Sequence, residues 1–108
     1  MKIPSCRGSY PAKLSAEMYP YIDDLHKQIY NNWKPIMDQV SDVRMSYVVD
    51  KYGTISDVQI GYSNASYEAE TAAKKAIMDL KASKFPAAVN LEELRLNHYF
   101  TVKANNIY

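Results

Sequence analysis

The side chains best suited to covalent or metal chemistry in this chain are one thiol, Cys6, and two imidazoles, His26 and His98. A cysteine beside a histidine can act as a nucleophile, and both residue types ligate zinc. The three residues fall on three different predicted elements, however, and Cys6 lies in a predicted lead-in segment. We therefore predict no catalytic residue, no metal site and no cofactor.

His26 has Asp23 three residues before it and Tyr30 four residues after it, so the three side chains can share one face of a helix. Such a row could be an acid–base cluster or a surface row of hydrogen bonds, and we favour the second interpretation. The sequence contains no phosphate-binding glycine motif, no HExxH and no CxxC. We predict that the protein is not an enzyme.

The composition and the length limit the functions and the number of domains that the chain can have. Thirteen Lys and Arg nearly balance twelve Asp and Glu, and the formal net charge is +1. Nucleic-acid binders usually rely on clustered basic residues, and the longest basic grouping here is Lys74-Lys75, so no nucleic-acid partner is predicted. No stretch approaches the ~20 apolar residues of a membrane span, and none is predicted in this chain. The 108 residues leave room for one domain.

Three alternating segments predict strands. Residues 43–50 and 54–62 are joined by a turn at Gly53, which tolerates a positive φ, and they predict a β-hairpin. The apolar face of the first carries Val43, Met45, Tyr47 and Val49. The expected apolar face of the second carries Val58, Ile60 and Tyr62. In the third segment, residues 94–103, the apolar row is Leu94, Leu96, His98, Phe100 and Val102.

Two helices accompany the strands. The first is predicted from Tyr19-Pro20 to Lys34-Pro35, because proline suits the start of a helix and disfavours its continuation. The second is rich in alanine, is capped by Ser66 and is predicted to end at Phe85-Pro86. The expected core has Trp33 as its anchor and also contains Ile22, Leu25, Ile29, Val58, Ile60, Ile77 and Leu80.

This order, α-β-β-α-β, predicts an α+β two-layer sandwich. It has a three-stranded antiparallel or mixed sheet, ordered second–first–third, with both helices on one face. Residues 1–18 are interpreted as a lead-in or linker remnant, residues 19–103 as the domain, and residues 104–108 as a tail.

In such a sheet the third strand has one free edge, to which a partner peptide can add as a further strand. Its polar face would supply specificity, and the predicted partner-binding residues are Arg95, Asn97, Tyr99, Thr101 and Lys103. The alternative is that charged side chains and the tail simply protect this edge. The ten tyrosines are compatible with an interface and equally with the preference of tyrosine for strands.

Four segments carry a resemblance to a known family. They are Ile29 with Trp33-Lys34-Pro35; Val43-x-Met45-x-Tyr47-x-Val49-Asp50-x-x-Gly53-x-Ile55-x-Asp57-Val58-x-Ile60; Ala72-Ala73-x-x-Ala76-Ile77; and Leu94-x-Leu96-x-x-x-Phe100. In this order they resemble the C-terminal domain of TonB and TolA proteins, and they are closer to the TolA type. The resemblance covers residues 19–103. The family's membrane anchor, the paired cysteines of some TolA domains and most of the family's proline-rich segment before the last strand have no counterpart here.

The resemblance implies a non-enzymatic, protein-binding domain of a cell-envelope energy-transducing or envelope-integrity system in the periplasm. Its partners would be an outer-membrane receptor or a periplasmic protein, with phage and bacteriocin proteins in the same class. Two other interpretations stay open. One is a small-ligand-binding or enzymatic domain with a pocket near His26 and Tyr30, and the other is a module that self-associates, for instance as a homodimer.

Overall fold

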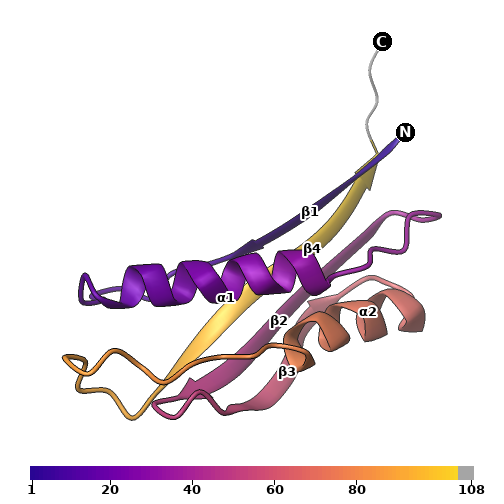
Figure 1. Ribbon diagram of the computed structural model, residues 1–108. Coiled ribbons are helices and arrows are strands. Elements are labelled where there is room, and N and C mark those ends of the chain that lie inside the picture. The colour runs from indigo at the N-terminus through magenta and orange to yellow at the C-terminus, as the bar shows by residue number, and fades with distance from the viewer. Residues whose placement is uncertain (105–108) are drawn as a thin grey trace.

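The computed structural model describes residues 1–104, and its elements follow the order β-α-β-β-α-β. The elements are β1 (Lys2–Gly8), α1 (Met18–Asn32), β2 (Ser41–Asp50), β3 (Ile55–Ser63), α2 (Tyr67–Met78) and β4 (Glu93–Ala104). The strands form one antiparallel sheet in the order β1-β4-β2-β3, and both helices lie on the same side of it (Figure 1). The α+β class and the order of the three predicted strands are confirmed. Of the predicted tail, residues 105–108 lie outside the described residues.

The prediction of a three-stranded sheet is wrong, because the segment interpreted as a lead-in forms a fourth strand. β1 pairs with β4 without interruption, from Lys2 opposite Ala104 to Gly8 opposite His98. None of the seven residues of β1 is fully buried. An edge strand with Pro4 and little buried surface shows no alternation of apolar and polar residues, which is why the pattern did not reveal it.

The hairpin between β2 and β3 follows from its local sequence. The Asp50 carboxylate accepts hydrogen bonds from the N–H groups of Tyr52 and Thr54, both at 2.9 Å. Gly53 has a φ of 88°, and a Cβ at this position would lie 2.5 Å from the carbonyl oxygen of Ala82. The turn therefore requires glycine both for its backbone conformation and for the close approach of a second segment.

The prediction that Tyr62 shares a face of β3 with Val58 and Ile60 is wrong. The register between β3 and β2 shifts between Arg44 and Met45, so that Met45 lies opposite Ile60 while Arg44 lies opposite Tyr62. Because adjacent residues of β2 point to opposite faces, Ile60 lies on the helix side and Tyr62 on the other side. A β-bulge at Gly61 thus reverses the alternation that the sequence pattern predicts.

The second helix begins as predicted, with the Ser66 hydroxyl accepting a hydrogen bond from the N–H of Ala69 at 3.2 Å. It ends at Met78, before the predicted end at Phe85. The side-chain amide of Gln28 in α1 binds both main-chain groups of Lys81. It accepts a hydrogen bond from the N–H at 2.9 Å and donates one to the carbonyl at 3.1 Å. These bonds hold the chain in a non-helical path toward β4.

The core lies between the sheet and the helices. Ile22, Leu25, Ile29 and Ile77 are buried as predicted, and Leu80 is 9% exposed. Val58 is half-buried and Ile60 is 44% exposed, because β3 is an edge strand with a neighbouring strand on one side only. Trp33 is also only half-buried, and its ring packs edge-on against Phe100 at 5.4 Å between centroids. Trp33 is therefore not the anchor of the core. The largest fully buried side chains are those of Tyr47 and Phe100.

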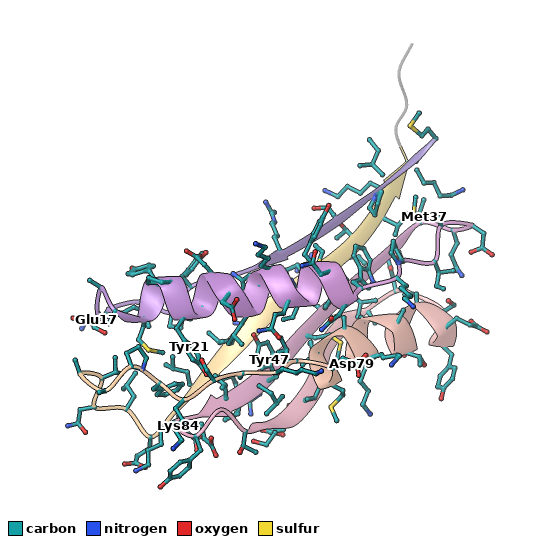
Figure 2. All side chains as sticks on the ribbon, viewed as in Figure 1. Glu17, Tyr21, Met37, Tyr47, Asp79 and Lys84 are labelled. Carbon is teal, nitrogen blue, oxygen red and sulfur yellow. The ribbon has the colours of Figure 1, made fainter. Side chains whose placement is uncertain are left out.

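Tyr47 projects from β2 into this core (Figure 2). Its hydroxyl has no hydrogen-bond partner among the described residues, and burial raises the pKa of the phenol. We expect Tyr47→Phe to raise the free energy of unfolding by about 1–3 kcal/mol, because it removes a buried, unpaired hydroxyl. Urea denaturation measures this. Tyr21→Phe is the matched control and should lower the stability, since the Tyr21 hydroxyl donates to the Ser83 carbonyl at 2.6 Å.

Candidate functional site

The five predicted partner-binding residues, Arg95, Asn97, Tyr99, Thr101 and Lys103, alternate along β4 with residues that face the helices. They therefore lie on the sheet face away from the helices, which we call the open face. Most of the edge that they were expected to flank is not free. β1 pairs with β4 from His98 to Ala104, so the prediction of a free β4 edge is wrong along these residues. The chain's own N-terminal segment lies where a partner strand was expected.

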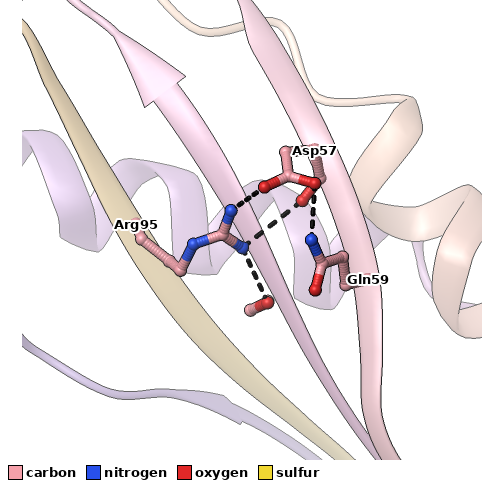
Figure 3. A network of polar contacts seen from close by, with 4 residues as sticks. Asp57, Gln59 and Arg95 are labelled. Carbon is pink, nitrogen blue, oxygen red and sulfur yellow. Dashed lines mark hydrogen bonds and ion pairs between the residues drawn. The ribbon is translucent and has the colours of Figure 1, made fainter.

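One of the five residues, Arg95, belongs to a polar network across three strands (Figure 3). Its guanidinium pairs with the Asp57 carboxylate and donates to the Ser46 hydroxyl at 2.9 Å. Gln59 donates to the same carboxylate at 2.6 Å, and this bond, together with Arg95, lowers the pKa of Asp57. Arg95 is thus already engaged within the sheet.

Three more of the five, Tyr99, Thr101 and Lys103, line a pocket of about 420 Å³ on the open face. Its remaining lining residues are Ser5, Arg7, Asp42 and Arg44. The pocket spans β1, β4 and β2, so it depends on the strand that the sequence pattern did not reveal.

The sheet has two outer edges, and they differ in regularity. β3 is interrupted by two register shifts, and Asp57 within it has a φ of 49°. Bulges of this kind twist an edge and discourage pairing with another strand. β1 pairs in continuous register from end to end, and within the described residues no strand lies on its other side. The regular free edge is therefore that of β1.

The main-chain groups that β1 presents outward follow from its register. The Ser9 N–H donates to the Asn97 carbonyl at 3.1 Å, which makes this a hydrogen-bonded pair. Such pairs alternate along an antiparallel ladder, so the odd-numbered residues of β1 face β4 and the even-numbered ones face outward. The outward N–H groups belong to Lys2, Cys6 and Gly8, and Pro4 stands where a missing N–H breaks no bond of the ladder.

Tyrosines lie above this edge. Tyr19, His26 and Tyr30 share one side of α1, and the His26 ring packs so closely on Gly8 that a Cβ there would lie 2.1 Å from Nε2. Tyr19 and Tyr30 are 44% and 65% exposed. Tyr10 lies beside Tyr19, with 5.7 Å between the ring centroids. An added strand next to β1 would find this aromatic row, Tyr10, Tyr19 and Tyr30, beside it.

The structure also brings together the three residues that the sequence left on separate elements. The Cys6 Sγ lies 3.0 Å from His98 Nε2, and the rings of His26 and His98 are 5.3 Å apart. Burial raises the pKa of the Cys6 thiol to about 12 and lowers the pKa of His98 to about 3. Burial also lowers the pKa of His26, although Asp23 opposes this effect. All three groups are therefore neutral near pH 7, and the thiol is not activated.

Only the pairing of β1 with β4 joins Cys6 to His98, 92 residues away, and no local pattern carries that information. Within residues 1–104, no group of three or more His, Cys, Asp or Glu side chains is arranged to hold a metal ion. In the same range, no helix is both long and apolar enough to cross a membrane.

A second pocket, of about 600 Å³, lies between the end of α1 and α2. Its walls include Asn32, Ile36 and Tyr67, so it is not the pocket expected near His26 and Tyr30. Comparisons with known proteins found no matching family model, curated protein or solved structure.

Proposed function

We propose that this chain is a non-enzymatic protein-binding domain that takes an extended segment of a partner as a fifth strand at the outer edge of β1. The observation that carries the proposal is the regularity of this edge. It offers outward N–H groups at Lys2, Cys6 and Gly8 to a peptide backbone. The aromatic row beside it adds rigid amphipathic surface of the kind enriched at protein interfaces.

The resemblance to TonB and TolA domains supports a partner from a bacterial cell envelope, and hence a periplasmic location. The helix, hairpin, helix and strand predicted from the sequence pattern all occur in the expected order, with β1 before them. The neutral, buried state of Cys6 and His98 supports a binding role over a catalytic one. The second candidate function is self-association, because two β1 edges could pair with each other as readily as one edge with a peptide.

Selection of peptides from a random display library, followed by NMR titration, tests this proposal. When peptide is added, we expect the amide signals of the protein that shift to be those of residues 2–8 and of Tyr19 and Tyr30. Cys6→Pro should abolish binding, because proline removes an outward N–H while the inward bonds of the ladder remain. Cys6→Ala is the matched control: it also loses the thiol but keeps the N–H, so it should bind normally.

Equal binding by the two variants would show that the edge of β1 is not the docking site. Sedimentation at rising protein concentration separates the two candidate functions. A dimer that Cys6→Pro dissociates and Cys6→Ala does not would favour self-association. A monomer at all concentrations that still binds peptide would favour the partner-binding domain.

A further inference from the structure

Arginine and tyrosine alternate in a row across the open face of the sheet. Arg7 of β1 lies opposite Tyr99 of β4. Arg44 of β2 lies between Tyr99 and Tyr62, and its guanidinium carbon is 5.1 Å from the centroid of the Tyr62 ring. A half-buried tyrosine thus separates two exposed guanidinium groups, and the row starts at the strand where the partner segment is proposed to add.

The pocket beside this row carries an excess of positive charge. Arg7, Arg44 and Lys103 line it together with a single carboxylate, that of Asp42. Asp42 pairs with Arg44 at 3.2 Å. Arg7 and Lys103 form no ion pair with another described residue, so two positive charges in the pocket are not neutralised by the part of the chain that the structure describes.

The lining groups favour an oxyanion as the ligand. A guanidinium can bind a carboxylate through two parallel hydrogen bonds, and the hydroxyl groups of Ser5 and Tyr99 can donate further bonds, whereas the Thr101 hydroxyl already donates to the Ser5 carbonyl at 3.4 Å. The position of Arg7 is decisive, because its side chain points to the open face from the outermost strand. Side chains directly opposite each other on neighbouring strands have Cβ atoms about 5 Å apart, so an acidic residue on an added strand would reach Arg7.

We propose that the partner segment is acidic, with an Asp or Glu side chain opposite Arg7 whose carboxylate enters this pocket. The inference rests on the proposed addition of a strand to β1 and specifies the charge that this edge selects. Lys103, the second cation of the pocket without an ion-pair partner among the described residues, strengthens the positive potential around the carboxylate. Nucleic acid fits less well, because the formal net charge of the chain is only +1 and binding to a chain of phosphates relies on clustered basic residues.

The test compares two synthetic peptides: one selected by display on the wild-type protein, and the same peptide with its Asp and Glu residues changed to Asn and Gln. We expect Arg7→Gln to lower the affinity for the acidic peptide about fivefold, the upper range for an exposed ion pair. The affinity for the peptide with Asn and Gln should stay unchanged. Lys74→Gln is the matched control, because it makes the same change of charge on exposed α2 and should affect neither peptide. The difference between the peptides should shrink at high salt.

Selected peptides without acidic residues, or equal effects of Arg7→Gln on both peptides, would overturn the inference. If those peptides still lose binding in Cys6→Pro, strand addition survives and only the charge preference fails. If no peptide binds at residues 2–8, the proposed function and this inference both fail. An oligothymidylate that displaces the acidic peptide from the wild type but not from Arg7→Gln would identify the pocket as a phosphate site and would also overturn the inference.

Discussion

Phe100→Ala is expected to lower the free energy of unfolding by about 3–5 kcal/mol, the largest loss among the substitutions considered. Phe100 is 1% exposed on β4, and its ring contacts both Trp33 and His98 at centroid distances of 5.4 and 5.0 Å. Removing the ring would leave a cavity between the sheet and α1 that these rigid neighbours cannot fill. Denaturation in urea, followed by circular dichroism, measures the loss.

Trp33→Ala is the comparison that the sequence pattern makes necessary, since Trp33 was expected to anchor the core. Because Trp33 is half-buried, its truncation should cost clearly less than that of Phe100. An equal loss of unfolding free energy in the two variants would mean that the indole stabilises the core as much as the phenyl ring does, contrary to the observed burial.

The second large effect concerns acid. His98 is fully buried, and burial, assisted by the nearby His26, lowers its pKa from 6.5 to about 3. The unfolded chain therefore binds a proton below pH 6.5 that the folded protein does not accept until about pH 3. The free energy of unfolding should have its full value above pH 6.5 and should decrease as the pH falls toward 3. This one histidine contributes a slope of up to about 1.4 kcal/mol per pH unit.

His26, whose ring lies near that of His98, contributes to the same titration, because burial lowers its pKa as well and the neighbouring Asp23 only partly opposes this effect. The Cys6 thiol stays neutral over this range of pH, and Asp23 accepts a hydrogen bond from the Tyr10 hydroxyl. His98→Phe isolates the contribution of His98, because a phenyl ring keeps aromatic packing without a titrating nitrogen. The difference in stability between wild type and variant, measured by urea melts from pH 7 to pH 4, should change with pH. A constant difference would show that His98 protonates equally in both states.

Features that depend on a few neighbouring residues could be predicted from the sequence. The turn at Gly53, the cap at Ser66 and the buried faces of β2 and β4 are all present, since each rests on local backbone geometry or on strict alternation. The apolar stripe of α1 likewise faces the core.

Features that depend on distant partners could not be predicted. β1 has no period of its own, and its role as a strand depends on a β4 edge far along the chain. The face of Tyr62 depends on a bulge, and a shift of one residue reverses every prediction beyond it. For the candidate site, the polar row of β4 was located correctly, but its contribution to the pocket required Arg7 and Ser5 from β1.

The pairing of β1 with β4 has a consequence for the order in which the sheet folds. β1 is synthesised before every other element of the sheet, and β4 after all of them, yet Lys2 must meet Ala104. The hairpin and α2 can form early from near neighbours, whereas closing a loop of nearly the whole domain is entropically slow. Until β4 folds, β1 is unpaired, and at high protein concentration it can pair with the β4 of another copy. Exchange of β1 between two copies would give a dimer in which each sheet contains a strand of the other copy.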